Sequence, residues 1–182
     1  MKKVLFSFAI AILLLACNDD KTKTEATVAG ASDSTAKQDL DLPYTASYSS
    51  SFTDDVSDAD LKTVLTTYKD WADNNMSGLS KGMGDTVTVE MSSGEHVVNT
   101  NADLMKRWST YRDSLSSVKI DMTGWKKMYA TDKKESYILT WYDETDTYKN
   151  GKADSASYHD INQLKDGKIT WYSQYKRPKK AK

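Results

Sequence analysis

The sequence has few residues of the kinds that bind metals or form cross-links. Its 182 residues include one cysteine, Cys17, and two histidines, His96 and His159. A single cysteine excludes an internal disulfide and a cysteine cluster for zinc or iron–sulfur, and two histidines argue against a multi-histidine metal site. Several enzyme classes are thereby removed, and we expect neither a metal nor a cofactor.

The sequence also lacks an excess of charge of either sign. Its formal net charge of −1 provides no electrostatic footprint for nucleic acid, so we expect no nucleic-acid partner. With 38% hydrophobic and 28% charged residues, the chain suits one modest globular domain with extensions. Five Trp and eleven Tyr supply large amphipathic side chains for a compact core or for a pocket.

Long apolar runs are absent as well. The run from Val4 to Ala16 is shorter than the about 20 residues of a spanning helix, but after the basic start Met1-Lys2-Lys3 it fits a secretory signal. It ends in Leu14-Leu15-Ala16-Cys17, which resembles a bacterial lipobox. This pattern predicts that residues 1–16 are a lipoprotein signal peptide and that a lipid on Cys17 attaches the protein to a membrane. The alternative is an ordinary signal peptide followed by a chance cysteine.

The segment 17–53 is mostly polar and shows little periodicity. Such a composition cannot bury enough apolar surface to offset the entropy of ordering, so we predict a disordered tether with a reach of roughly 30–35 Å. Its start, Asn18-Asp19-Asp20-Lys21, resembles the surface-export signal of Bacteroidetes lipoproteins, which implies an outer-membrane lipoprotein displayed at the cell surface. A solvated, charged start to a linker is the other interpretation.

Residues 54–177 carry the periodic patterns of a folded domain. Ser57-Asp58-Ala59-Asp60 can cap a helix, and apolar residues then recur at helical spacing on one face: Leu61, Val64, Leu65, Tyr68 and Trp71. Met76 to Met83 indicates a short second helix. The acidic residues at the start of this region lack the loop pattern of a calcium site, so helix capping and solvation explain them better.

Two short strands and a third helix are predicted next. Thr86–Met91 alternates as a half-buried strand does, Ser92-Ser93-Gly94 turns the chain, and His96–Val98 forms a short partner. Thr100 or Asn101 then caps a helix with one side lined by Leu104, Trp108, Tyr111 and Leu115. His96, beside a turn, is interpreted as a solvated residue.

From Val118 onward the sequence predicts four consecutive strands. Ile120–Tyr129 and Ser136–Tyr142 precede a turn at Asn150-Gly151, and a second hairpin turns at Asp166-Gly167. Consecutive hairpins imply antiparallel pairing. In the strand before the second turn, alternate residues share one face, namely Tyr158, Asp160, Asn162 and Leu164, whereas His159 lies on the other. The tail, residues 178–182, is basic and is interpreted as a frayed, solubilising end.

This order of elements, with Asp160 in an aromatic strand before Asp166-Gly167-Lys168-Ile169, resembles the SnoaL-like proteins of the nuclear transport factor 2-like superfamily. The resemblance implies an α+β fold, a cone in which N-terminal helices pack in a curved, mostly antiparallel sheet. It also implies a pocket between the helices and the sheet. Many functions share such a scaffold, so function has to be argued from the site.

The resemblance provides two enzyme mechanisms to compare residue by residue. In SnoaL-like polyketide cyclases an Asp at the position of Asp160 acts as a base with a His on a neighbouring strand, and this sequence has the Asp without that His. In ketosteroid isomerases the same Asp donates a hydrogen bond to an oxyanion, and the base position falls here on Met91, next to Glu90, which should face away. Neither catalytic set is complete.

Asp160 is the candidate catalytic residue, alone or with Asp143 on the neighbouring strand. We expect burial among Tyr158, Trp141 and Trp171 to raise its pKa, as a general acid or base near neutral pH requires. The alternative is a structural Asp that is hydrogen-bonded to a neighbouring Tyr or Trp inside a wet pocket.

Two functions therefore stay open. One is a non-catalytic module that binds a small, partly apolar molecule, and the other is a lyase, isomerase or cyclase that uses Asp160. The predicted pocket is lined by aromatic and amide side chains: Tyr68, Trp71, Trp108, Trp141, Tyr158, Asn162 and Trp171. A further expectation is a homodimer through the outer face of the sheet, with Thr140, Tyr142, Thr170 and Tyr172 on that surface.

Overall fold

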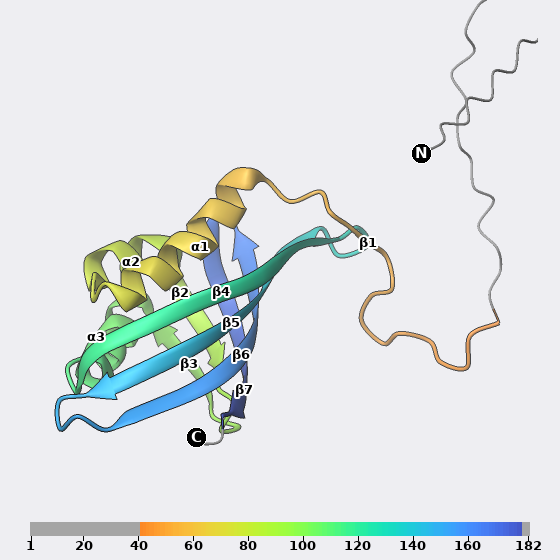
Figure 1. Cartoon of the computed structure of the whole chain (residues 1–182). Helices are drawn as coiled ribbons and strands as arrows, with labels where there is room; N and C mark the ends of the chain where they lie inside the picture. The colour runs from red at the N-terminus through yellow and green to blue at the C-terminus, as the bar shows by residue number, and fades with distance from the viewer. Residues whose placement is uncertain (1–40, 180–182) are drawn as a thin grey trace, which may run out of the picture. The chain divides into compact units, whose positions relative to one another are not determined.

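The computed structural model describes residues 41–179. The predicted signal peptide, Cys17 and most of the predicted tether lie outside the described residues, as do residues 180–182 of the basic tail. The chain divides into two units, Met1–Pro43 and Tyr44–Lys182, and every element below belongs to the second (Figure 1). This unit contains the whole hydrophobic core cluster of the described residues, as a domain that can fold alone does.

Three helices of the described region begin where polar side chains cap them. α1 (Asp58–Ala72) begins after Ser57, whose hydroxyl accepts a hydrogen bond from the Asp60 amide at 3.0 Å. α2 (Met76–Gly82) begins after Asn75 and α3 (Asn101–Arg112) begins after Thr100, each with the same kind of side-chain cap. The predicted helices are confirmed except at Leu115, which lies beyond the end of α3 and is buried in a strand. Within residues 41–179, no helix has the length and apolar character needed to cross a membrane.

The strands of the described region form one seven-stranded sheet. They are β1 (Phe52–Thr53), β2 (Met83–Glu90), β3 (His96–Thr100), β4 (Leu115–Ala130), β5 (Glu135–Tyr148), β6 (Ala153–Lys165) and β7 (Lys168–Pro178), in the order β1-β4-β5-β6-β7-β2-β3. All neighbours are antiparallel except β2 and β7, which are parallel. The predicted meander is therefore confirmed as β4 to β7. Pairing of β1 with β4 places hydrogen-bonded structure before Asp54, inside the segment that composition assigns to the tether.

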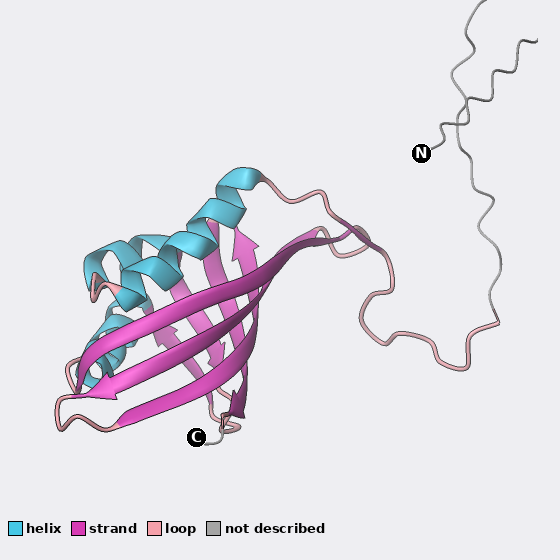
Figure 2. Ribbon diagram, viewed as in Figure 1, coloured by secondary structure: helices cyan, strands magenta, loops and turns pink. Residues whose placement is uncertain are grey.

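The helices cover one face of a strongly curved sheet, as Figure 2 shows. Their apolar sides pack against the inward-facing residues of the strands. Val64 from α1, Leu104 from α3, Val87 from β2, Ile138 from β5 and Ile169 from β7 are all completely buried there. The core thus lies between the helices and the concave face, and the strand residues that alternate with it form an outer face.

A bulge in β7 determines which of its aromatic residues faces the helices. Leu164 pairs with Ile169, but Gln163 pairs with Trp171, so Thr170 is an extra residue in β7. Alternation restarts after the extra residue. Ile169 is buried on the inner face, and Trp171 lies on the outer face beside Gln163, because directly paired residues share a face.

The residues expected on the outer surface of the sheet are mostly elsewhere. Thr140 and Tyr142 are buried on the inner face, and the bulge turns Tyr172 inward as well, so their assignment to a dimer surface is wrong. The outer face carries Trp141 and Tyr175, which pair with His159 from either side and are both exposed. Homodimerisation through this face stays a prediction.

A buried arginine caps the C-terminal end of α1. Arg112, the last residue of α3, is 5% exposed. Its Nε donates to the Trp71 carbonyl at 3.2 Å and its Nη2 donates to the Ala72 carbonyl at 3.1 Å. The last carbonyl groups of a helix have no partner inside the helix, and a cation is favourable at that end of the helix dipole. Arg112 therefore joins α3 to α1.

Arg112→Met should lower the free energy of unfolding by about 2 kcal/mol, because the Ala72 carbonyl loses the Arg112 donor and the Trp71 carbonyl keeps only the Asn74 amide. Urea denaturation at pH 7 measures the difference. Lys106→Met, at an exposed position of the same helix, is the matched control and should cost less than about 0.5 kcal/mol. Equal midpoints for the two variants would show that the cap contributes no stability.

Candidate functional site

A cavity of about 400 Å³ lies between the helices and the concave face of the sheet. This volume falls within the range of about 300–1,000 Å³ that is usual for small-molecule sites. Most of the wall is aromatic or aliphatic: Tyr68, Trp71, Leu79, Met83, Val89, Met91, Val97, Leu104, Trp108, Tyr111, Tyr142, Tyr158 and Tyr172. The polar part of the wall consists of Thr67, Ser92, Ser93, Arg107, Glu144, Asp146, Asn162, Gln174 and Lys176.

Most of the residues that the sequence suggests for the pocket line this cavity. They are Tyr68 and Trp71 from α1, Trp108 from α3, and Tyr158 and Asn162 from β6. The alternation of β6 carries Tyr158 and Asn162 to the same face as Asp160.

Trp141 and Trp171 do not line the cavity, and their assignment to it is wrong. Trp141 pairs with His159 across β5 and β6, and the two rings stack on the outer face with centroids 4.9 Å apart. Trp171 is turned outward by the bulge in β7. Because Thr140 and Tyr142 face inward, alternation along β5 turns Trp141 to the outer face.

Asp160 lies under the cavity wall and is completely buried. Its Oδ2 accepts hydrogen bonds from the hydroxyl groups of Tyr142 at 2.8 Å, Tyr68 at 2.9 Å and Tyr172 at 3.0 Å. These tyrosines, from β5, α1 and β7, line the cavity whereas Asp160 does not. The expected neighbours of Asp160 were Trp141, Tyr158 and Trp171, but its hydrogen-bond partners are these three tyrosines instead. Asp160 is therefore separated from the cavity by their hydroxyl groups.

Two amide side chains fix the direction of these hydrogen bonds. Asn162 Nδ2 donates to the Tyr68 hydroxyl at 3.2 Å, and Gln174 Nε2 donates to the Tyr172 hydroxyl at 2.7 Å. A hydroxyl group that accepts from an amide can direct its own proton to the carboxylate. Asn162 and Gln174 therefore orient tyrosine protons toward Asp160.

Burial and these hydrogen bonds act on the Asp160 carboxyl in opposite directions. Burial raises its pKa, the three tyrosine hydroxyl groups lower it, and the result is a pKa of about 7. Its second oxygen, Oδ1, has no hydrogen-bond partner among the described residues. The pKa of Tyr68, Tyr142 and Tyr172 is raised well above the usual value, first by burial, so these residues stay protonated donors.

Asp143 does not join Asp160. It lies on the outer face of β5, where it accepts a hydrogen bond from Ser157 at 2.7 Å and contacts Lys179. The alternation of β5 explains the difference, because Tyr142 and Asp143 must face opposite sides of the sheet. Glu90 faces away from the cavity beside His96, whereas Met91 lines the cavity.

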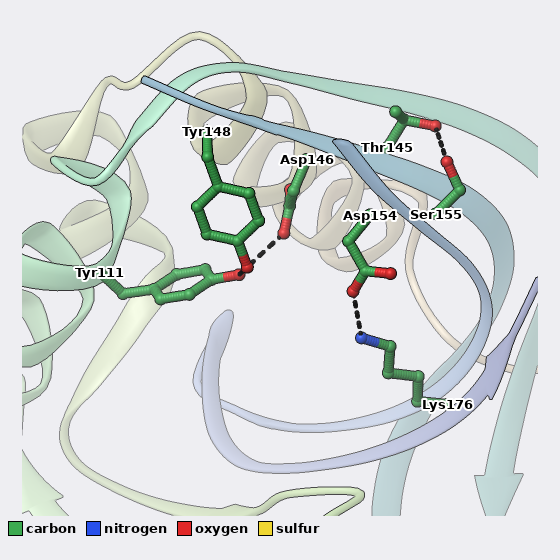
Figure 3. Close-up of polar contacts among 7 residues, drawn as sticks. All are labelled: Tyr111, Thr145, Asp146, Tyr148, Asp154, Ser155 and Lys176. Atoms are coloured by element: carbon green, nitrogen blue, oxygen red, sulfur yellow. Dashed lines mark hydrogen bonds and ion pairs between the residues drawn. The ribbon is translucent and has the colours of Figure 1, made fainter. Parts of the chain in front are cut away.

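A second carboxyl pair, Glu144 and Asp146, does line the cavity, and sequence reasoning missed it. The Tyr111 hydroxyl donates to Asp146 Oδ2 at 2.9 Å, and Figure 3 shows Tyr111 and Tyr148 directed toward Asp146. The polar run 143–146 suggests that the strand ends at Tyr142, but β5 continues to Tyr148. Extending the inward alternation from Thr140 and Tyr142 by four residues would have found the pair.

Burial and mutual proximity shift both carboxyl groups. The pKa of Glu144 is raised to about 8, first by burial and then by the negative charge of Asp146. Burial also raises the pKa of Asp146, although hydrogen bonds from Tyr111 and Glu144 oppose it. A pair of this kind holds one proton between its members near neutral pH and carries about one negative charge. Within residues 41–179, no group of three or more acidic or histidine side chains is placed to hold a metal ion.

Comparison with known proteins identifies the architecture. No protein-family model matches the sequence, and no curated protein has a significantly similar sequence. Among solved structures, an LEH-like epoxide hydrolase from M.tuberculosis is similar with a TM-score of 0.56 at 9% identity, over 65% of this chain and 83% of that chain. An NTF2-like protein of unknown function from Exiguobacterium sp. 255-15 has a TM-score of 0.54 at 15% identity, over 63% of this chain and 98% of that chain.

The domain has the nuclear transport factor 2-like fold. AusH from Aspergillus nidulans has a similar structure, with a TM-score of 0.54 at 14% identity over 67% of this chain and 86% of that chain. The α+β fold class is therefore confirmed. In this nuclear transport factor 2-like domain, the cavity lies between the helices and the concave face of the sheet.

Proposed function

We propose that the nuclear transport factor 2-like domain binds one small, partly apolar molecule in its cavity. The observation that carries the proposal is the cavity itself, about 400 Å³ in volume, with a wall of aromatic and aliphatic side chains interrupted by nine polar residues. Such a wall gives affinity through apolar burial, and its polar groups orient the ligand. The inner ends of the large side chains leave this space open instead of filling it.

The proposal places the domain at the cell envelope. A lipid on Cys17 would anchor the chain to the outer membrane, and the acidic residues after Cys17 favour display at the cell surface. Residues 17–43, which precede the compact unit, would then act as a tether that holds the domain clear of the bilayer. Support for this part of the proposal comes from the sequence pattern at the start of the chain.

A thermal-shift screen of lipids, steroids, aromatic compounds and oligosaccharide fragments tests ligand binding. A compound present at about ten times its dissociation constant should raise the melting temperature by on the order of 5 °C. Val97→Phe should weaken binding of a hit about tenfold or more, because Val97 lines the cavity and a larger side chain takes up ligand volume.

Val98→Phe is the matched control. Val98 is the next residue of β3 and is 60% exposed, so the same substitution adds its ring outside the cavity. It should leave ligand affinity unchanged. The proposal fails if no compound class stabilises the protein, or if the two variants weaken binding equally.

A second candidate function is a lyase, isomerase or cyclase, and the Asp160 network is the observation that favours it. A buried carboxyl with a pKa of about 7 can exchange protons near neutral pH. Asp160 would act through the tyrosine hydroxyl groups that separate it from the cavity. Solved structures of this fold include a protein described as an LEH-like epoxide hydrolase and one described as a putative polyketide cyclase. Mass spectrometry after incubation with each bound compound distinguishes the candidates, since unchanged compounds argue for binding alone.

A further inference from the structure

The carboxyl pair at one end of the cavity is separate from the Asp160 hydrogen bonds. Glu144 and Asp146 are two residues apart in β5, so both side chains point inward, and both line the cavity. Asp146 is 6% exposed. Its Oδ2 accepts from Tyr111, and apart from the proton that it shares with Glu144 its Oδ1 meets no donor among the described residues. A buried acceptor without a donor is costly, so this end of the cavity lacks a donor that a ligand can supply.

The cationic side chains of the cavity wall are paired with other carboxylates. Arg107 contacts Glu95 at 2.6 Å, and Lys176 contacts Asp154 at 3.1 Å. Figure 3 shows Lys176 directed to Asp154 while Asp146 is directed to Tyr111. Neither Glu95 nor Asp154 lines the cavity. Within residues 41–179, no Lys, Arg or His side chain forms a salt bridge with Glu144 or Asp146.

Aromatic rings complete this end of the cavity. Trp71 from α1 and Tyr111 from α3 lie parallel with ring centroids 6.1 Å apart. Tyr158 from β6 is a third aromatic residue of the same wall, and Lys176 Nζ lies 5.7 Å from the centroid of its ring. Aromatic faces attract cations, and rings combined with carboxylates are a common means of holding ammonium groups. The Trp71 and Tyr111 rings beside the pair therefore favour positive charge from a ligand, while Lys176 is held by Asp154 and Tyr158.

We propose that the end of the cavity formed by Glu144, Asp146 and Tyr111 binds the ammonium group of a small organic amine, whose apolar part occupies the rest of the cavity. The inference rests on the proposed ligand-binding function and names its ligand class. The ammonium donates a hydrogen bond to Asp146 Oδ1 and lies against the aromatic rings. The two carboxyl groups, sharing one proton, balance the single positive charge.

Isothermal titration calorimetry of the compact unit Tyr44–Lys182 with matched probes tests the inference. The probes are 2-phenylethylamine, 2-phenylethanol and 3-phenylpropanoate, which share an aromatic ring and differ in charge. At pH 7 the amine should bind at least about tenfold more tightly than the alcohol, because a charge-assisted hydrogen bond replaces a neutral one. The carboxylate should bind more weakly than either.

Asp146→Asn should reduce affinity for the amine about tenfold or more and leave affinity for the alcohol unchanged. Glu144→Gln is a second variant with the same expected direction, which keeps the test open if the first variant does not fold. The matched control is Asp143→Asn. It removes the same charge from the same strand, but Asp143 lies on the outer face beside Ser157 and Lys179, so the preference for the amine should persist.

The outcomes separate this inference from the function on which it rests. Equal affinity for amine and alcohol, tighter binding of the carboxylate, or an equal loss in Asp143→Asn overturns the amine site and leaves a pocket for neutral ligands. If 2-phenylethylamine does not bind but compounds of the thermal-shift screen do, the amine site is also overturned and the proposed ligand-binding function stands. If no compound binds in either experiment, both the amine site and the proposed ligand-binding function fail.

Discussion

Raising the pH from 4.5 to 8 is expected to cost the wild-type domain about 3 kcal/mol of stability through Asp160 alone, and Asp160→Asn should remove that loss. The carboxyl has a usual pKa of 3.8 and a pKa of about 7 in the folded protein, first because it is buried. Since its pKa is higher in the folded state, the folded state binds the proton more tightly. The contribution of Asp160 to stability is therefore greatest at low pH and is lost as the pH rises through about 7.

Other titratable groups near Asp160 determine how much pH dependence of stability the Asp160→Asn variant keeps. Tyr68, Tyr142 and Tyr172 face it from α1, β5 and β7, and they stay protonated over this range because their pKa is raised. Glu144 has a pKa of about 8, raised partly by the charge of Asp160, and contributes a loss of the same sign. The variant should thus keep the part of the pH dependence that belongs to Glu144.

Urea denaturation at several pH values between 4.5 and 8 measures the prediction for Asp160→Asn. The comparison uses the slope of stability with pH, because the amide also changes the hydrogen bonds with the three tyrosines at every pH. Asp143→Asn is the control. Lys179 and Ser157 hold the pKa of Asp143 below its usual value, so that carboxyl stays ionised over the tested range and its loss should leave the slope unchanged. A wild-type slope near zero, or an unchanged slope in Asp160→Asn, would contradict the assignment.

Local patterns in the sequence predicted the helices, the hairpins and the inward side of β6. Ser57 and Thr100 cap the helices because their side chains satisfy amide groups within three residues, an interaction that the local sequence specifies. Asp166-Gly167 sets the turn between β6 and β7 for a similar reason, since both residues have positive φ angles. From that turn, alternation carries Asp160 and Asn162 to the same face.

The composition of the site depended on contacts between distant residues. Thr170 is an extra residue in β7, and this shift of one residue placed Tyr172 instead of Trp171 at the cavity. The side chains around Asp160 come from α1, β5 and β7, which no local pattern brings together. Glu144 and Asp146 were missed because polar residues ordinarily end a strand, whereas here a cavity allows them to face inward. The charged residues Glu144 and Asp146 therefore marked the wall of a cavity and not the start of a loop.

Cys17→Ser is expected to abolish lipidation and to leave residues 1–16 attached to the protein. The prediction rests on the basic start, the short apolar run and Leu14-Leu15-Ala16-Cys17 at its end. Lipid chains stabilise membrane association by about 0.8 kcal/mol per buried CH₂ group, so several chains on one residue anchor a protein firmly. Without them, the basic tail is too short to hold a domain of balanced charge at a membrane in physiological salt. The variant should therefore accumulate as a precursor that its uncleaved apolar segment retains.

Intact-mass analysis of detergent-extracted protein measures both parts of this prediction for Cys17. Wild-type protein should lack residues 1–16 and carry the added mass of acyl chains, whereas the variant should have the mass of the full chain. Asn18→Ser is the matched control, because it places a serine beside the cysteine and keeps the thiol, so processing should proceed as in the wild type. An unmodified Cys17, or cleavage at another bond, would overturn the anchor. It would also remove the basis for surface display, since that proposal requires the lipid to come first.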